Sequence, residues 1–412
     1  MKYNDIATTF HMASISEEPA KFAEKEYRNR LELPSTFKTN IILEGSHSVF
    51  AVLFRESIML ISDILHRESH VDGIWQQLPG VARKAYLSDL LTEELLSTNL
   101  MEGVQSTRQE VSAALQSVDK PSSHTRFSEF AKLYTGLNSK DALQLPESLV
   151  DIRDIYDKVV QGELDEGTEP DGELFRKDQV YIHDISTGRE IHRGLPSEIS
   201  IQTALTQMLI FMHKENIPSL VKAIICHYAF EYIHPFYDGN GRTGRFLLAL
   251  QLREHLSAPT ALSLSPVIAG NKQIYYKAFE NAENPLNCSE LSFFVYQMLQ
   301  FIQIAQKQLE DSLQEKDYAL GNASRAAAEF AEQNHLDKTS DAILSMLIQQ
   351  RLFHEQSPEL TRTVFARYEG VGQVKIRTKL QSLIEKGLVS TVGKRPIYYE
   401  LSDKACELFG IV

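Results

Sequence analysis

Apolar residues recur at helical spacing along most of this chain of 412 residues. This spacing runs from about Ser46 to Ser117 and resumes after Ser200. We expect the last long helical tract of this part to end near Gly321. A period of this kind predicts amphipathic helices. Before the C-terminal part only one segment, 178–200, alternates apolar and polar residues around turn residues, Ser186 to Gly188, which predicts a short β-hairpin. The chain is therefore predicted to be mainly α.

Length and composition limit the possible classes of protein. A chain of this length is expected to form more than one folding unit. The three cysteines are far apart, so neither a disulfide framework nor a zinc site is expected. The N-terminus has no apolar signal-peptide core, and the longest uncharged runs are too short or too polar to span a bilayer, so we expect a cytoplasmic protein without membrane contact. The net charge of -13 argues against a chain-wide surface for polyanions.

The periodic segments suggest three parts. Residues 1–120 are predicted to be a helical region, and residues 121–320 hold the motif described below. In residues 336–412, three short helical patterns precede a hairpin tipped by Gly393 to Pro396, which is typical of a winged helix-turn-helix. These last residues carry eleven Lys and Arg against nine Asp and Glu. The basic residues of the recognition helix and wing could meet DNA phosphates, although many winged helices bind proteins instead: Lys375, Arg377, Lys379, Lys394 and Arg395.

The most informative segment is HPFYDGNGRTGR, residues 234–245, which directly follows an apolar run. We expect a loop between two buried helices, the second of which begins near Thr243. Backbone N–H groups at Gly239 and Gly241 can close on phosphate oxygens, and the helix N-terminus adds partial positive charge. Arg242 and Arg245 are three residues apart and can grip phosphates bidentately.

Two further residues of this segment carry chemistry. Asp238 supplies a hard oxygen suitable for Mg2+ that is otherwise held by phosphates and water. His234 can take a proton from an attacking hydroxyl, because imidazole titrates near neutral pH. Together with the glycines and arginines, these groups indicate phosphoryl or nucleotidyl transfer. The segment is neither a Walker A loop nor a dinucleotide-binding fingerprint.

The segment matches the signature HPFx(D/E)GN(G/K)R of the Fic family at every specified position, and the second arginine is also present. The chain resembles this family from about Lys132 to Gln306. The resemblance implies a helical Fic core with a small β-hairpin flap that docks the target. Such proteins mostly move AMP from ATP onto a hydroxyl of a target protein and release pyrophosphate. The kinase-like Doc branch is disfavoured, because this sequence keeps Gly241 and Arg242.

The resemblance also implies roles for individual residues. His234 would be the base, Asp238 would hold Mg2+, and Phe236 would anchor the loop in the core. The residues that would bind ATP are Gly239, Asn240, Gly241, Arg242, Gly244, Arg245, Tyr275 and Tyr276, and those of the flap are Val180, Tyr181, Ile182 and His183. Core packing remains an equal alternative for Tyr275 and Tyr276. We expect His183, His192 and His227 to be structural or surface residues rather than metal ligands, since no metal-binding spacing joins them.

A second match lies upstream, in the segment STNLMEGV. Thr98, Glu102 and Gly103 fit the pattern (S/T)xxxE(G/N) that self-inhibited Fic enzymes carry on a helix. Thr98 and Glu102 are one helical turn apart and so face the same way. The resemblance implies an N-terminal inhibitory helix whose Glu102 pairs with Arg245 where the ATP γ-phosphate would lie. Alternatively, Glu102 is an exposed residue before a Gly103 helix cap.

The leading hypothesis is thus a self-inhibited protein adenylyltransferase. Its target would be a Ser, Thr or Tyr hydroxyl of another protein, or of the chain itself, and homodimers are common among such proteins. Two alternatives remain. The same site could remove AMP or transfer another phosphate-containing group, or the chain could be a DNA-binding regulator that senses nucleotide.

Overall fold

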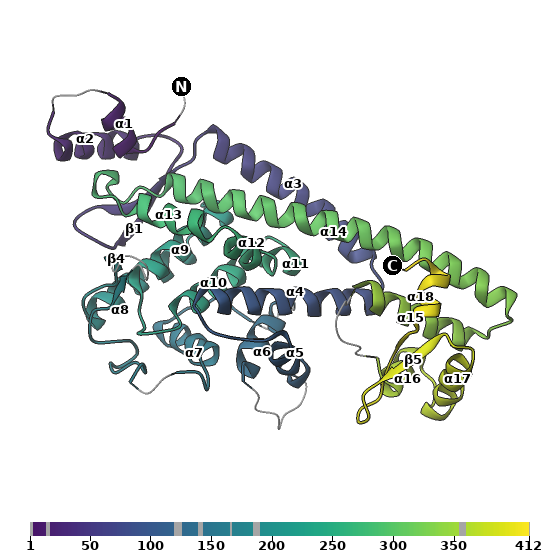
Figure 1. Ribbon diagram of the computed structural model, residues 1–412. Helices are drawn as coiled ribbons and strands as arrows, with labels where there is room; N and C mark the ends of the chain where they lie inside the picture. Colours follow the sequence, from purple (N-terminus) through teal and green to yellow (C-terminus); the bar gives the residue numbers. More distant parts are fainter. Residues whose placement is uncertain are drawn as a thin grey trace. The chain divides into compact units, whose positions relative to one another are not determined.

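The structure is a computed structural model that describes residues 3–13, 17–118, 126–138, 143–164, 167–183, 190–353 and 360–411 (Figure 1). The predicted turn from Ser186 to Gly188 lies outside the described residues. The helices and strands, in chain order, are α1 (Ile6–Met12), α2 (Pro19–Leu31), β1 (Thr36–Ile42), β2 (Ser48–Val52), α3 (Arg55–Gln77), α4 (Gly80–Met101), α5 (Arg108–Ser117), α6 (Ser128–Gly136), α7 (Leu149–Val159), β3 (Tyr181–His183), β4 (Glu190–Arg193), α8 (Glu198–Met212), α9 (Ser219–Ile233), α10 (Asn240–Leu252), α11 (Ala258–Ala261), α12 (Leu264–Gly270), α13 (Lys272–Ala282), the 3-10 helix η1 (Pro285–Asn287), α14 (Ser292–Gln333), α15 (Lys338–Phe353), α16 (Arg362–Glu369), α17 (Gln373–Glu385), β5 (Val389–Val392), β6 (Tyr398–Leu401) and α18 (Asp403–Phe409).

The predicted mainly helical class is confirmed, because the strands of the described residues form only three two-stranded sheets. The chain divides into two compact units. The first unit consists of Met1–Glu68 and Leu91–Lys307, and the second of Ser69–Leu90 and Gln308–Val412. The three-part division read from the sequence stays a prediction. No helix of the described residues is both long and apolar enough to cross a membrane.

The core of the first unit is built around α9 and α10, which lie side by side (Figure 1). Most residues of α9 are buried, as expected for a central helix that is apolar nearly all round. Every residue of α10 is buried as well, including the polar residues of its first turns. Helices α7 and α8 pack nearby, and each begins with a capping box, at Ser148 and Ser197 respectively. This arrangement places the turn between α9 and α10 inside the unit.

One hairpin in this unit was not predicted. Strands β1 and β2 pair antiparallel, with Phe37 opposite Ala51, although the sequence pattern indicated helix from about Ser46 onward. The prediction was wrong because β2 is short and buried on both faces, and a short continuous apolar run cannot be assigned to strand or helix by periodicity. Helix α3 begins only at Arg55.

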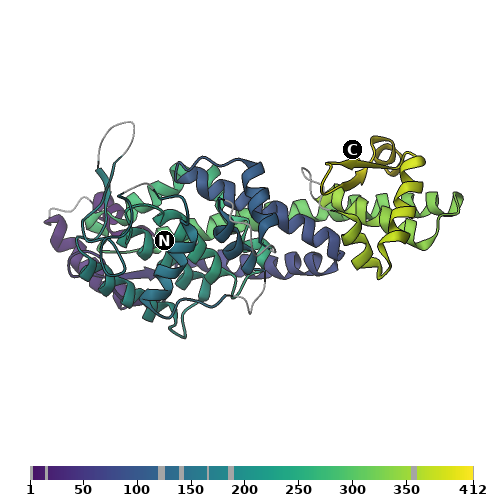
Figure 2. The same cartoon turned by 90° about the horizontal axis from the view of Figure 1, so that it is seen from below.

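The second unit contains α15, α16 and α17 followed by the β5–β6 hairpin, in the order that the sequence predicted (Figure 2, olive to yellow). Its core includes Ile343, Leu347, Phe365 and Leu383. The prediction that this helical tract ends near Gly321 is wrong, because helix α14 continues to Gln333. Glycine costs a helix only about 1 kcal/mol, and the alanine-rich sequence after it supports the continuation.

We expect Leu383→Ala on α17 to destabilise the second unit by about 2–5 kcal/mol, because Leu383 is fully buried and its loss leaves a cavity. Val374→Ala on the same helix is the matched control. Since Val374 is 81% exposed, its replacement should change the free energy of unfolding by about 0.5 kcal/mol or less. Urea unfolding of both variants measures the difference, and equal effects would contradict the assigned helix face.

Candidate active site

His234 lies at the C-terminus of α9 in a left-handed backbone conformation, with φ of 51°. Its Nδ1 is 3.2 Å from the backbone oxygen of Glu231. Because a carbonyl oxygen only accepts hydrogen bonds, Nδ1 carries the proton and Nε2 keeps its lone pair. Burial, with the neighbouring His192, lowers the pKa of His234 to about 4. The imidazole is therefore neutral at pH 7 and can accept a proton at Nε2.

The turn that follows His234 is closed by one side chain. The amide of Asn240 accepts a hydrogen bond from the backbone N–H of Phe236 at 2.9 Å and donates one to its carbonyl oxygen at 2.8 Å. Helix α10 begins at Asn240, earlier than the predicted start near Thr243. Gly239 precedes it with φ of 78°, and a methyl group there would lie 2.5 Å from Val160. Only glycine fits this position.

Phe236 and Asp238 occupy the same turn. Phe236 is fully buried and stacks on Tyr156 of α7, with ring centroids 3.5 Å apart, so it packs as the predicted anchor would. Asp238 is half-buried, and its Oδ1 accepts a hydrogen bond from the backbone N–H of Gly239 at 2.7 Å. No cluster of three or more His, Cys, Asp or Glu among the described residues could hold a metal. A single carboxylate still suits Mg2+, which takes its other ligands from phosphates and water.

Arg245 is bound to the end of α4. Its Nε donates to Oγ1 of Thr98 at 2.8 Å, and its Nη2 donates to the backbone oxygen of Thr98 at 3.0 Å. Nη2 also lies 2.9 Å from Oε1 of Glu102, so the ion pair that the resemblance implied is present. The arginine side chain is 3% exposed and that of Glu102 is 22% exposed. Although burial alone would raise it, Arg245 holds the pKa of Glu102 below its usual range.

Glu102 also lies against the start of α10. A methyl group on Gly241 would be 2.2 Å from Oε1 of Glu102, so the carboxylate occupies the space beside this glycine. Glu102 directly follows the last residue of α4, and Gly103 has φ of 73°. The predicted alternative, a glycine cap, is thus compatible with the ion pair. The carboxylate fills the place where the backbone N–H groups of α10 could receive an anion.

Arg242 has a different carboxylate partner. Its Nη1 lies 2.8 Å from Oε2 of Glu163, and both side chains are at most 3% exposed. Arg242 is therefore not part of a solvated helix face. Sequence reasoning missed Glu163, because it lies in a loop 79 residues away and no motif marks it.

Arg176 is a second residue that the sequence did not single out. It is fully buried and donates hydrogen bonds to four backbone oxygens, those of Asp178, Leu195, Ile233 and His234, at 2.6 to 3.2 Å. These bonds satisfy carbonyl groups at the end of α9 and join them to both sides of the flap segment. A buried arginine in the sequence has no periodic signature, so only the structure reveals it.

The two tyrosines predicted on the nucleotide side differ in environment. Tyr275 is 2% exposed, and its hydroxyl is 2.8 Å from Nε2 of His227, which favours the packing alternative. Tyr276 is 45% exposed, with Nζ of Lys272 5.5 Å from its ring centroid. Burial, with some contribution from Arg245, lowers the pKa of His227 to about 3. His227 therefore behaves as a neutral core residue.

The predicted flap residues form or precede strand β3. Tyr181 pairs with Arg193 and Ile182 with His192 of β4, and the carbonyl of Val180 accepts a hydrogen bond from Gly194 at 3.1 Å. Tyr181 is 48% exposed. His183 belongs to the strand, but its side chain lies outside the described residues. The hydrogen bond between Gly194 and Val180 thus lies next to Asp178 and Leu195, whose carbonyl groups accept hydrogen bonds from Arg176.

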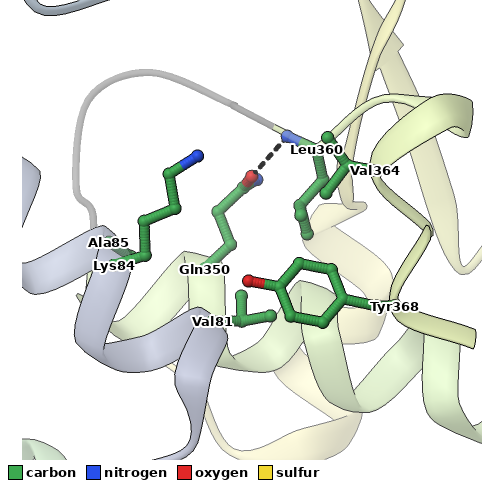
Figure 3. Close-up of a pocket in the computed structure, with 7 residues that line it drawn as sticks. All are labelled: Val81, Lys84, Ala85, Gln350, Leu360, Val364 and Tyr368. Atoms are coloured by element: carbon green, nitrogen blue, oxygen red, sulfur yellow. Dashed lines mark hydrogen bonds between the residues drawn. The ribbon is translucent and has the colours of Figure 1, made fainter. Parts of the chain in front are cut away.

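Two cavities of the described residues lie away from the motif. A groove of about 490 Å³ is lined by residues of α13, η1 and α14, including Ile274, Lys277 and Phe293. A cavity of about 30 Å³ in the second unit is lined by Val81, Lys84, Ala85, Gln350, Leu360, Val364 and Tyr368. Figure 3 shows the backbone N–H of Leu360 bound to Gln350, with the hydroxyl of Tyr368 directed towards the same cavity. This cavity has room for about one water molecule and none for a nucleotide.

Comparison with known proteins shows a similarity in the part of the chain that holds the site. Residues 146–252 match the model of the Fic/DOC family. The chain is 32% identical over 115 residues to the protein adenylyltransferase Fic of Drosophila virilis, which covers 27% of this chain and 21% of that protein. It is 41% identical over 71 residues to a probable protein adenylyltransferase of Aquifex aeolicus, covering 17% and 20% respectively. The chain thus spans about a fifth of the length of these relatives.

A solved structure is similar in fold to a larger part of this chain. A Fic family protein from Desulfovibrio desulfuricans G20 aligns with a TM-score of 0.50 and 18% identity over 85% of this chain and 97% of its own. At this identity the likeness shows the fold alone. Together these findings show that residues 146–252 are similar to the Fic/DOC family and that the fold is like that of a Fic family protein.

We expect Arg176→Lys to lower the free energy of unfolding by about 3 kcal/mol, because lysine cannot reach four carbonyl oxygens and leaves buried acceptors unsatisfied. Arg193→Lys is the control, since that side chain is 57% exposed and should change stability by about 0.5 kcal/mol or less. Denaturant unfolding compares the two variants. Equal stability of both would show that the carbonyl bonds of Arg176 contribute little.

Proposed function

We propose that this protein is a self-inhibited protein adenylyltransferase, which moves AMP from ATP to a hydroxyl side chain of a target protein and releases pyrophosphate. One observation carries the proposal. The carboxylate of Glu102 lies at the N-terminus of α10, between Gly241 and Arg245, where a phosphate group would otherwise bind. A protein anion in that place indicates a site made for anions and a restraint on their binding.

The first step of the reaction falls to His234. Its neutral imidazole accepts the proton of the target hydroxyl at Nε2, while the Nδ1–H bond to Glu231 fixes the ring. The hydroxyl oxygen forms a bond with the α-phosphorus of ATP. The bond from that phosphorus to the oxygen bridging to the β-phosphate breaks, and pyrophosphate leaves with the electron pair.

The negative charge of the triphosphate is neutralised at the start of α10. The backbone N–H groups of the first turn, next to Gly239 and Gly241, face the phosphates, and Arg242 and Arg245 offer guanidinium donors. Asp238 is the residue that would hold Mg2+, which neutralises charge on the phosphates when bound. Tyr276, the more exposed of the two tyrosines, is the better candidate for a contact with the nucleotide.

Glu102 acts as the restraint. While Arg245 is paired with Glu102, it is not available to the γ-phosphate, and ATP can bind only in an unproductive pose. Loss of the carboxylate frees the arginine and the space beside Gly241. A coupling of this kind is typically worth about 5–150-fold in affinity or rate.

We expect Glu102→Gly to incorporate label from α-labelled ATP with Mg2+ into protein strongly and wild type only weakly. The amount of incorporated label should differ by about tenfold or more. Adding His234→Ala to Glu102→Gly should remove about 10²–10⁴-fold of the activity, because the base is lost. Labelling is measured on the protein itself and on a cell lysate.

Glu93→Gly is the matched control for this experiment, because Glu93 lies on α4 and pairs with Arg108 outside the site. It should leave labelling at the wild-type level. Absence of label in every variant despite ATP binding would reject AMP transfer and favour AMP removal or another phosphate-containing group. DNA binding that survives His234→Ala, without transfer, would favour the nucleotide-sensing regulator.

The acidic limb of the pH profile of kcat/KM for Glu102→Gly should lie near the pKa of His234, about 4, rather than near 6.5. Burial and His192 keep the imidazole neutral, whereas Glu102 raises its pKa, so the substitution moves the limb lower still. The rate should therefore change little between pH 7.5 and about 5.5, where a base of ordinary pKa would lose about tenfold. A limb centred near 6.5 would contradict the described environment of His234.

The second unit is proposed to carry a winged helix-turn-helix in residues 336–412. Support comes from its three helices and terminal hairpin, and from the exposed Lys375, Arg377, Lys394 and Arg395. Lys379 is bound to Asp337 at 2.8 Å and contributes less charge than predicted. DNA and protein remain the two candidate partners. Cytoplasmic location and a homodimer are likewise proposals from the sequence.

A further inference from the structure

The two arginines of the motif are each paired with a carboxylate, but the two carboxylates are placed differently. Glu102 is partly exposed and lies beside Gly241. Glu163 is 3% exposed, and the arginine it binds, Arg242, is 1% exposed. Residues this deeply buried are not readily exchanged for a ligand, since breaking a buried pair leaves an uncompensated charge in the core.

The pair between Arg242 and Glu163 leaves donors unused. It is formed by Nη1 of the arginine and Oε2 of the glutamate. The Nε of Arg242 is buried without a hydrogen-bond partner among the described residues. Its Nη2 is 3.7 Å from the position that a methyl group on Gly239 would take. The edge of the guanidinium formed by Nε and Nη2 therefore faces the turn at the start of α10, where backbone N–H groups can also bind an anion.

Glu163 is held in place by the end of α7. Its backbone N–H donates to the carbonyl of Val160 at 2.9 Å, and Val160 in turn binds the carbonyl of Tyr156. Tyr156 stacks on Phe236 inside the motif. Burial raises the pKa of Glu163, although Arg242 and Arg126 oppose this effect. The glutamate is thus linked to the loop by packing as well as by charge.

We propose that Glu163 is a positioning residue for the nucleotide: it holds Arg242 by Nη1 so that the remaining donors of the guanidinium face the phosphates. The inference rests on the proposed function and deepens it. Glu102 and Glu163 then have opposite roles. Glu102 occupies the phosphate position and must leave it, whereas Glu163 stays bound while ATP binds.

Preorganisation of this kind has a definite consequence. An arginine fixed by a carboxylate loses less side-chain freedom when it binds an anion, so removal of the carboxylate weakens nucleotide binding. A competitor would do the reverse, because its removal would strengthen binding. The direction of the change in affinity therefore separates positioning from inhibition.

The test uses the full chain with Glu102→Gly in every variant. The Kd of ATP with Mg2+ is measured directly by calorimetry, and KM and kcat by AMP transfer. We expect Glu163→Ala to raise the Kd and KM about tenfold, with kcat changed by about threefold or less. Glu163→Gln keeps an oxygen that accepts from Nη1 and should restore most of the affinity. Glu169→Ala, an exposed charge on the same connection, should have no effect.

A double-mutant cycle shows whether Glu163 acts through Arg242. In the presence of Arg242→Ala, Glu163→Ala should change the Kd by about twofold or less. If Glu163→Ala fails to fold, Glu163→Asp keeps the charge but shortens the side chain, and it should raise the Kd in the same way.

An unchanged or lower Kd in Glu163→Ala would overturn the inference. A rise of about tenfold in Kd caused by Glu163→Ala in the presence of Arg242→Ala would also overturn it. These outcomes leave AMP transfer by Glu102→Gly intact and so do not touch the proposed function. Conversely, ATP binding with the expected changes but no AMP transfer would reject the function and keep the positioning role. Failure of Glu102→Gly to bind ATP would overturn both.

Discussion

The closed turn between α9 and α10 is the constraint on which the rest of the site depends. Asn240 binds both the N–H and the carbonyl of Phe236, and Arg176 binds the carbonyls of Ile233 and His234. The groups of Phe236 and Ile233 are buried and the bond to His234 is partly buried, and leaving a buried group unsatisfied would cost about 1–3 kcal/mol. The position of His234 is therefore set by hydrogen bonds within the protein. Its left-handed backbone conformation is stable because both neighbouring segments are held.

The second constraint is charge. Two guanidinium groups are buried at one helix end, and each is neutralised by a carboxylate from another element. Without these partners the arginines would be uncompensated charges in the core, at a cost of several kcal/mol. Their environments are not equal, because Glu102 is 22% exposed and Glu163 only 3%. A ligand anion can replace the partner that water already reaches more easily than the one enclosed by α7 and the loop.

The sequence predicted the helical class and the site motif because both depend on local patterns. Periodicity marks buried helix faces, and the glycines around Asn240 are needed where the backbone turns or a side chain approaches closely. Glu163 and Arg176 could not be predicted, since their roles come from contacts with residues distant in the sequence. The β1–β2 hairpin was missed for a different reason: its second strand is a short apolar run that fits either structure. The sequence pattern predicts a helix end near Gly321, but burial of neighbouring alanines outweighs the low helix propensity of this glycine.

Under the proposed function, the anchoring of α4 limits how Glu102 can leave the space beside Gly241. Further back on the helix, the buried Glu94 accepts hydrogen bonds from Ser265 and Tyr134, and the carbonyl of Met101 accepts one from Lys272 of α13. Displacement of the end of the helix would break these bonds and leave Glu94 unsatisfied in the core. Rotation of the Glu102 side chain breaks only its own contact with Arg245, because Glu102 lies just beyond the last residue of the helix. Side-chain rotation is therefore the less costly route, and it leaves the bonds between Thr98 and Arg245 in place.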